Sequence, residues 1–339
     1  MVETLGDIGE FGLIGRIHKL TEREGTRAHG ITLGIGDDCA AFKPDEDFEI
    51  LITCDCMIEG RHYLPGHITP FDMGRRAMVM NISDIGAMGG IPLYALVSLG
   101  LKKDTPVRDV EDIYRGFLRE LNPLGAAVIG GNITGTDSSI FINITMTGKV
   151  ESERMMRRSG ARAGDVILVT GCPGQAAAGL KRLMDNHLAG DFYKDPLVTA
   201  YNLPVHRARE GRAVALSGMA TSMIDISDGL MGDLGHICQE SGVGAEIIRN
   251  KLPISEHMRD LINPQGWDVY ELITGDSDDY ELIITCEPGN KEKVMAAVAE
   301  ISDVPVTEIG IITKQDGMKI ITPDGVRHPV RPTGWDHFR

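Results

Sequence analysis

Ser139–Val150, with the sequence SIFINITMTGKV, sets the architecture that we expect for this chain. Its apolar residues Ile140, Ile142, Ile144 and Met146 fall at every second position. A period of two is typical of a β-strand that buries one of its faces. The chain should therefore contain a sheet with one face turned towards a core, and the neighbouring segments indicate what forms that core.

Helical and strand-like segments alternate on both sides of this strand. A helix should begin at Pro70, after Thr69, because proline is favoured at the first helical position, and should run to about Met88. We expect further helices at 11–20, 107–121, 175–184, 205–216, 229–241 and 290–301. We expect further strands at 31–35, 48–53, 93–101, 126–129, 166–170, 222–226, 245–248, 281–286, 304–311 and 318–321.

The composition changes directly after Val150, where an Arg-rich charged run occupies residues 151–158. The chain has 339 residues, which is more than one hydrophobic core usually serves. We therefore predict two domains, at residues 1–150 and 151–339. Because both mix strands with helices, the predicted fold class is α/β with mixed (α+β) sheets.

The charge of the chain limits its partners. A net charge of −15 and a pI of about 5.1 argue against nucleic acid or an anionic membrane as a partner. No stretch approaches the ~18 apolar residues of a membrane span, and Met1–Gly9 is unlike a signal peptide. The six cysteines form no zinc-binding pattern and indicate reduced thiols in the cytoplasm. If this acidic protein binds an anionic ligand, divalent cations are the obvious bridge between the two.

Short acidic motifs at the expected strand ends form the candidate site. Asp55 should directly follow a strand at 50–54, and Asn132 should lie just beyond the strand at 126–129. Strand ends commonly bind ligands, Asp oxygens suit magnesium, and glycines let backbone N–H groups approach phosphates. Each motif alone could be a turn, and Asp228 could simply cap the helix that follows it. The motifs are Gly34–Asp38 (GIGDD), Asp55, Asn81–Asp84 (NISD), Gly130–Asn132 (GGN), Asp225–Gly229 (DISDG) and Gly275–Tyr280 (GDSDDY).

Asp84 carries more information than the other acidic residues. On a helical wheel of ~100° per residue it falls in a stripe with Met73, Ala77, Met80 and Met88. A carboxylate without a partner on an apolar stripe is energetically unfavourable, so Asp84 should meet a cation or a metal ion.

Familiar nucleotide-binding patterns are absent from the sequence. There is no Gly-x-x-x-x-Gly-Lys-Ser/Thr loop and no protein-kinase motif set. One glycine-rich turn, Gly171–Gln175, precedes an expected helix and could hold a phosphate at the helix N-terminus, although it lacks a lysine.

Taken in order, the motifs resemble those of the thiamine-monophosphate kinases, within the wider group of aminoimidazole-ribotide synthetase-like ATP enzymes. The resemblance runs from Gly9-Glu10-Phe11 to an ending, GWDHF at 334–338, that resembles the kinases rather than the synthetases. The other specific pieces are GIGDDCA at 34–40, EGRHY at 59–63, NISDIGAM at 81–88, RSGARAG at 158–164, IDISDGL at 224–230 and DYEL at 279–282.

The resemblance implies an N-terminal domain that pairs with its copy in a homodimer, and a C-terminal α/β domain, with ATP and Mg²⁺ in the cleft between the domains. The implied metal ligands are Asp38, Thr53, Cys54, Asp55, Asp84, Asn132, Asp225 and Asp228. The implied ATP contacts are Gly131, Asn132, Arg158 and Ser227. The implied contacts with thiamine monophosphate are His62, Asp278 and Trp335.

Three departures from the family pattern affect these expectations. Asn132 replaces an aspartate, so one metal ion should bind more weakly. Cys54 and Cys56 replace threonines, and because thiols are poor magnesium ligands, any contact from Cys54 should use its backbone. Asp278 replaces a longer glutamate and should reach a substrate amine less well.

The expected activity is ATP-dependent phosphorylation of thiamine monophosphate to thiamine diphosphate by direct in-line transfer. The acceptor phosphate is largely ionised near neutral pH, so it needs relief from charge repulsion rather than a general base. Asp84, Asp225 and Arg158 are the expected catalytic residues. Two alternatives stay open at this point. One is a synthetase or maturation factor of the same group that uses ATP to activate an amide or carbamoyl group, and the other is a non-catalytic ATP-binding regulator.

Overall fold

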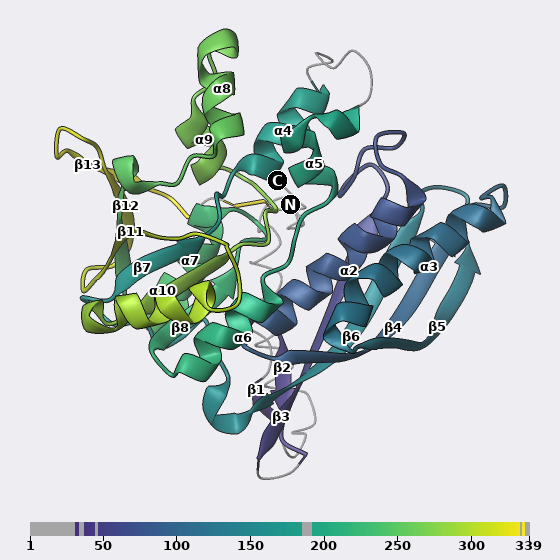
Figure 1. The fold of residues 1–339 in the computed structure, drawn as a ribbon, viewed down its shortest axis with the longest axis horizontal. Coiled ribbons are helices and arrows are strands. Elements are labelled where there is room, and N and C mark those ends of the chain that lie inside the picture. The colour runs from purple at the N-terminus through teal and green to yellow at the C-terminus, as the bar shows by residue number, and fades with distance from the viewer. Residues whose placement is uncertain (1–30, 34–36, 45–46, 185–191, 333, 336–339) are drawn as a thin grey trace, which may run out of the picture.

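The computed structural model describes residues 31–33, 37–44, 47–184, 192–332 and 334–335 (Figure 1). The expected helix at 11–20, residues 34–36 of the first acidic motif and residues 336–338 of the ending lie outside these ranges. Among the described residues, none of the helices combines the length and the apolar character that a membrane crossing requires. Two mixed sheets with helices packed against them make up the chain, so the predicted α/β class is confirmed.

The first sheet contains the strands of the N-terminal half in the order β1-β2-β3-β6-β4-β5. β4 and β5 pair in parallel, and the other neighbouring strands are antiparallel. The alternation predicted for Ser139–Val150 is confirmed, because every second residue of β6 is buried. The strands are β1 (Ile31–Leu33), β2 (Ala40–Phe42), β3 (Phe48–Ile58), β4 (Ile91–Leu101), β5 (Ala127–Gly135) and β6 (Phe141–Glu151).

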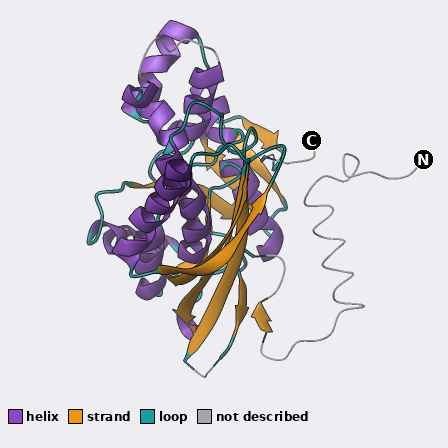
Figure 2. Cartoon of the chain, turned by 90° about the vertical axis from the view of Figure 1, so that its right-hand side faces the viewer, coloured by secondary structure: helices purple, strands orange, loops and turns teal. Residues whose placement is uncertain are grey.

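Two helices, α2 (Pro70–Ala87) and α3 (Val107–Leu121), lie on one side of this sheet (Figures 1 and 2). The predicted start of α2 is confirmed, because the side chain of Thr69 accepts a hydrogen bond from the backbone N–H of Asp72 at 3.2 Å. This cap satisfies one of the N–H groups that the first turn of a helix leaves without a partner.

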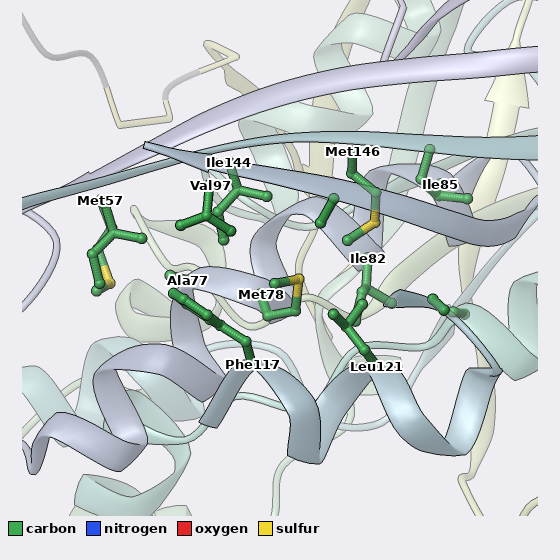
Figure 3. Packing of buried hydrophobic residues seen from close by; sticks show 14 of the residues in the cluster. Met57, Ala77, Met78, Ile82, Ile85, Val97, Phe117, Leu121, Ile144 and Met146 are labelled. Atoms are coloured by element: carbon green, nitrogen blue, oxygen red, sulfur yellow. The ribbon is translucent and has the colours of Figure 1, made fainter. Parts of the chain in front are cut away.

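α2 is buried on nearly all sides, since it lies between the first sheet and α3 (Figure 3). Ile82 of α2 lies between Met146 from β6 and Leu121 from α3, and all three side chains are fully buried (Figure 3). Burial of such side chains contributes about 1.5–3 kcal/mol each. The packing therefore fixes the position of α2, and with it the position of the acidic motif that α2 carries.

The second sheet contains the strands of the C-terminal half in the order β13-β12-β9-β11-β7-β10-β8. Its strands are β7 (Val166–Thr170), β8 (Ala220–Asp225), β9 (Gly244–Ile248), β10 (Leu282–Cys286), β11 (Val306–Thr313), β12 (Gly317–Ile321) and β13 (Arg327–Val330). The helices of this half are α4 (Gln175–Met184), α5 (Pro196–Asn202), α6 (Ala208–Ser217), α7 (Leu230–Ser241), α8 (Glu256–Gln265), α9 (Val269–Thr274) and α10 (Lys291–Ala299). Of these elements, α5, α8, α9 and β13 were not predicted.

The two halves meet where α2 packs against α6, and glycines make this contact close. A Cβ atom added to Gly86 would lie 2.5 Å from the Cα of Ala208, and one added to Gly211 would lie 2.2 Å from the carbonyl oxygen of Gly86. Only glycine permits two helix backbones to approach so closely at these positions. The contact places the C-terminal end of α2 beside the second sheet.

Two predicted strand ends are wrong, and both concern candidate site residues. β3 continues to Ile58, so Asp55 lies inside the strand rather than after it. β5 continues to Gly135, so Asn132 also lies within a strand. A polar side chain does not end a strand whose backbone ladder continues, and β3 pairs with β6 along its whole length, from Phe48 to Ile58.

Candidate active site

A cavity of about 840 Å³ lies between the two halves of the molecule, and side chains from both halves line it. Eight of the residues selected from the sequence are among those that line it. They are Asp55, His62 and Asp84 from the N-terminal half, and Asp225, Ser227, Asp228, Asp278 and Trp335 from the C-terminal half.

The motif Asn81–Asp84 at the end of α2 makes hydrogen bonds with site residues on two different strands. The hydroxyl of Thr53 donates a hydrogen bond to the carboxylate of Asp84. The side chain of Asn81 accepts a hydrogen bond from the backbone N–H of Asp55 at 3.3 Å, and the hydroxyl of Ser83 donates to the carboxylate of Asp225. One turn of helix therefore connects β3 of the first sheet with β8 of the second.

Three of the predicted metal ligands, Asp38, Asp84 and Asp225, have carboxylate oxygens that all lie within 4.8 Å of one another. Burial raises the pKa of Asp225 to about 8, and the charge of Asp38 adds to this effect. Burial also raises the pKa of Asp84 well above its ordinary value, and so do the neighbouring carboxylates, of which Asp55 has the largest effect. Several carboxylates so close together cannot all be ionised without a cation.

The donor set suits a hard divalent cation. One carboxylate oxygen of Asp38, Oδ2, is buried and has no hydrogen-bond partner among the described residues. A buried acceptor without a partner is unfavourable, and a metal ion would supply the missing interaction. The cluster offers carboxylate oxygens, which are the ligands that Mg²⁺ prefers. The residues present therefore fit the magnesium ion that the sequence motifs implied.

Arg158 is a cation that directly contacts this cluster. Its Nη2 lies 2.6 Å from Oδ1 of Asp38 and its Nε lies 3.2 Å from the same oxygen. Its backbone N–H donates to the carboxylate of Asp37 at 3.3 Å. Burial acts to lower the pKa of Arg158, but the charge of Asp38, the hydrogen bond to Asp38 and the charge of Asp37 together outweigh it, so the pKa is raised. The guanidinium thus neutralises one carboxylate of a larger group.

The loop Ser227–Gly229 is held by a residue that the sequence analysis missed. The carboxylate oxygen Oδ2 of Asp233 accepts hydrogen bonds of 3.1 Å from the backbone N–H groups of Ser227, Asp228 and Gly229. The position of Asp233, in the first turn of α7, is where a carboxylate stabilises a helix start, and this was the signal available in the sequence. Trp335 reaches the same loop, because its backbone N–H donates to the carbonyl oxygen of Asp228 at 3.0 Å.

The cavity also contains a buried arginine, Arg76, that was missed from the sequence; it precedes Asp84 on α2 by two turns, which is about 12 Å along the helix axis, and so lies towards the other end of the cavity. Arg76 comes from α2 and donates hydrogen bonds to the carboxylate of Asp278 and to the backbone carbonyl of Tyr201. His62 and Trp335 line this cavity too. Nothing in the local pattern distinguishes Arg76 from Arg75 beside it.

Three predicted residues on β3 and β5 lie away from the aspartate cluster. Cys54 precedes Asp55 on β3, so its side chain projects from the opposite face of the sheet. There its sulfur lies 3.5 Å from the side-chain oxygen of Asn143. Asn132 pairs with Ser98, which pairs in turn with Asn143, so Asn132 shares this outward face. Gly131, next to Asn132, lies on the same exposed strand β5.

The glycine-rich turn before α4 does not offer its N–H groups to a phosphate, which was one possibility raised by the sequence. The carboxylate of Asp279 accepts hydrogen bonds from the backbone N–H groups of Gly174 at 2.5 Å and Ala176 at 2.9 Å. The hydroxyl of Ser277 accepts a third, from Ala177, at 3.1 Å. The helix start is thus capped by the motif Gly275–Tyr280, and the turn serves to position that motif.

This fold and this site have counterparts among known proteins. Residues 36–150 match the family model of the AIR synthase related protein, N-terminal domain, and residues 162–322 match that of the AIR synthase related protein, C-terminal domain. The molecule therefore has the two-domain fold of the AIR synthase related proteins, with an acidic cavity between its halves.

Within that class of proteins, sequence identity to individual relatives shows which family the chain belongs to. The chain is 34% identical to the thiamine-monophosphate kinase of Aquifex aeolicus over 98% of this chain and 99% of the relative. It is 35% identical to that of Escherichia coli K12 over 97% of this chain and 98% of the relative. The chain belongs to the thiamine-monophosphate kinase family.

Solved structures agree with this assignment. One described as "AaThiL complexed with AMPPCP and TMP" superposes with a TM-score of 0.84 at 32% identity, and covers 99% of both chains. The thiamine-monophosphate kinase of Stenotrophomonas maltophilia K279a superposes with a TM-score of 0.76 at 31% identity, and covers 94% of this chain and 98% of its own.

Proposed function

We propose that this chain transfers the terminal phosphoryl group of ATP to thiamine monophosphate and so forms thiamine diphosphate and ADP. The observation that carries the proposal is the cavity between the two halves, in which carboxylates from both halves converge. The identity of the substrates is inferred from the relatives of this chain, since the structure of one of them was solved with AMPPCP and TMP. This reaction is a step of thiamine diphosphate biosynthesis.

Magnesium is part of the proposal. Asp38, Asp55, Asp84, Asp225 and Asp228 would hold it, with Thr53 fixing the carboxylate of Asp84. When bound, Mg²⁺ would relieve the repulsion between the two anionic substrates and stabilise the charge of the transferring group. Asp84 and Asp225 act as catalytic residues in this role.

The remaining residues bind and orient the substrates. Arg158 and Ser227 contact ATP, and Arg158 adds a positive charge near the transferred group. His62, Asp278 and Trp335 contact thiamine monophosphate at the other end of the cavity. With both substrates held in one cavity, the acceptor phosphate attacks the terminal phosphorus in line, and no phosphorylated enzyme forms. Gly131, Asn132 and the backbone of Cys54 remain candidates for a nucleotide or metal contact at the outward face of the sheet.

We also propose that two copies pair through this outward face. α2 and α3 cover the other face, whereas Tyr94, Leu96 and Ile129 are 50%, 48% and 60% exposed. An apolar patch of this kind on one face of a sheet favours association with a second copy. Leu96→Asp should give monomers in sedimentation velocity, and an unchanged sedimentation coefficient would rule out this interface.

The cytoplasm is the proposed location. All six cysteines are free thiols, which suits a reducing compartment, and ATP is available there.

The direct test of function is an assay with purified protein, ATP and thiamine monophosphate, with and without Mg²⁺. Thiamine diphosphate should form together with ADP, and only when Mg²⁺ is present. Tight ATP binding without any thiamine diphosphate would instead favour a non-catalytic nucleotide-binding protein.

A further inference from the structure

Arg76 is the side chain that joins the two halves of the molecule inside the cavity. It comes from the middle of α2, is only 1% exposed and lines the cavity. Its guanidinium lies 4.7 Å from the centre of the Tyr201 ring and donates to the backbone carbonyl of the same residue. A buried arginine needs several partners to offset its lost hydration, and these partners come from the opposite half of the chain.

Asp278 is the acidic partner of Arg76. One carboxylate oxygen, Oδ2, accepts the hydrogen bond from Arg76, and the side chain remains 28% exposed. Since Asp278 lines the cavity, part of its carboxylate stays accessible to a ligand there. Arg76 Nε is buried and has no hydrogen-bond partner within the described part of the chain, so the guanidinium still has a donor to give.

The backbone around Asp278 is held independently of Arg76. Its neighbours Ser277 and Asp279 bond the N–H groups at the start of α4. Loss of the Arg76 guanidinium would therefore change the charge and orientation of the Asp278 side chain more than the position of its loop.

We propose that Arg76 is a positioning residue that keeps Asp278 ionised and aimed into the cavity, and thereby selects an acceptor substrate whose heteroaromatic ring carries an amino group. This inference rests on the proposed function, because it concerns the recognition of the phosphorylated acceptor.

The physical reason is the difference between a carboxylate and a carboxylic acid. An ionised carboxylate only accepts hydrogen bonds, so it binds the N–H donor of an exocyclic amino group and repels a carbonyl oxygen at the same position. Burial raises the pKa of Asp278, and Arg76 acts in the opposite direction. Without Arg76 the carboxyl group would take up a proton more readily, and a protonated acid can donate as well as accept. The cavity would then no longer prefer a substrate with an amino group over one with an oxygen at that position.

The test compares two substrates. One is thiamine monophosphate, and the other is its analogue with oxygen in place of the pyrimidine amino group. A site built to bind a donor discriminates strongly against an analogue that lacks it, so the wild-type ratio of kcat/KM should be at least ~10². Arg76→Met should lower this ratio to below ~10 and raise the KM for thiamine monophosphate about tenfold or more, with the KM for ATP within about twofold of wild type.

Arg75→Met is the matched control, because Arg75 is the preceding residue and carries the same charge. It pairs instead with Glu120 at 2.6 Å and is not among the residues that line the cavity. This variant should keep the wild-type ratio. The double variant Arg76→Met, Asp278→Asn removes both charges of the pair, so it should melt at a higher temperature than Arg76→Met while its preference stays lost.

Failure of the proposed function and failure of the specificity role of Arg76 would give different results. If the wild type makes no thiamine diphosphate, the proposed function is wrong. If the wild type is active and Arg76→Met lowers kcat/KM equally for both substrates, then Arg76 only stabilises the fold and the specificity role is overturned. Retained binding of an ATP analogue shows that the variant is folded.

Discussion

The two ends of the cavity handle negative charge differently. At the aspartate end, Asp84 and Asp225 line the cavity, and their carboxylate oxygens and that of Asp38 lie within 4.8 Å of one another; the guanidinium of Arg158 contacts Asp38. At the other end, around Arg76 and Asp278, where we propose that the acceptor binds and which we call the acceptor end, Asp278 has a guanidinium of its own, that of Arg76.

This difference indicates which end depends on an ion from solution. The acceptor end is neutralised by the protein, so its geometry can form during folding. The aspartate end holds more carboxylates than cations, and its charge is balanced only by protons or by metal ions. Substitutions at the two ends should therefore differ in how strongly their effects depend on a metal ion.

The largest effect should come from Asp84→Asn, which removes one charge at the aspartate end without a change of shape. Turnover should fall by at least ~10²-fold, because the variant loses a ligand for the ion that stabilises the transferring charge. The metal-free variant should melt at or above the wild-type temperature, since one buried like charge is gone. Activity is measured as thiamine diphosphate formed, and melting by circular dichroism.

Asp112→Asn is the control for Asp84→Asn. Asp112 lies on α3 and pairs with Arg115 at the surface, so turnover should stay within about twofold of wild type. Near-normal turnover of Asp84→Asn would show that the aspartate end is not where the metal ion acts.

The pH dependence of the metal-free protein should differ from that of the magnesium-bound protein. The pKa of Asp225 is raised to about 8 in the folded state, from an ordinary value of 3.8. Between these two values the folded state holds a proton that the unfolded state has released. Stability should therefore fall as the pH rises from about 4 to about 8, by ~1 kcal/mol per pH unit for each such proton.

Mg²⁺ should remove this dependence, because it favours the ionised carboxylates that rising pH produces. The measurement is thermal melting in EDTA and in Mg²⁺ at a series of pH values, with Asp225→Asn as the control that flattens the metal-free curve. A metal-free protein that becomes more stable with rising pH would contradict the assignment of a protonated cluster.

A smaller effect is expected from Arg158→Gln. Arg158 occupies Oδ1 of Asp38, so it competes with a metal ion for that carboxylate. Its removal should tighten binding of Mn²⁺ in the absence of nucleotide by roughly tenfold, and should weaken binding of an ATP analogue.

Arg157→Gln separates this local competition from a general change of charge. Arg157 is the preceding residue and its side chain is exposed, so the same substitution there should change Mn²⁺ affinity by less than about twofold. Calorimetric titration of both variants gives the comparison. If Arg158→Gln binds Mn²⁺ more weakly than wild type, then Arg158 supports the metal site and does not compete for it.

Helices and strands could be predicted wherever the apolar residues of a segment repeat with one regular spacing. The bounds of α3, α4 and β7 agree with the expected 107–121, 175–184 and 166–170, because each is a short run with a single regular pattern. The aspartate end was largely found as well, since acidic motifs beside strands carry a local signal.

Partners across the two halves could not be predicted in the same way. Arg75 and Arg76 are identical neighbours in the sequence, yet one pairs with Glu120 and the other with Asp278, 202 positions away. Their helical positions differ by ~100°, and only the packed fold shows which direction faces the cavity. The strand ends at Asp55 and Asn132 were wrong for a related reason, because the pairing of a strand depends on its neighbours in the sheet.

The smallest effect is expected from Cys54→Ser, compared with Asp55→Asn at the next position of β3. Side chains of adjacent strand residues point to opposite faces, and the thiol of Cys54 contacts Asn143 and Thr145 on the outward face. Asp55 faces the cavity instead. The Mg²⁺ concentration for half-maximal activity should change by less than about twofold in Cys54→Ser, and should rise about tenfold or more in Asp55→Asn.

Such a result would place the boundary of the metal-dependent end within β3 itself, between two adjacent side chains. A shift in Cys54→Ser as large as that in Asp55→Asn would mean that the outward face also contributes to the metal site. The contrast between the two ends of the cavity would then have to include the outward face of the sheet, where Asn132 lies and where we place the second copy.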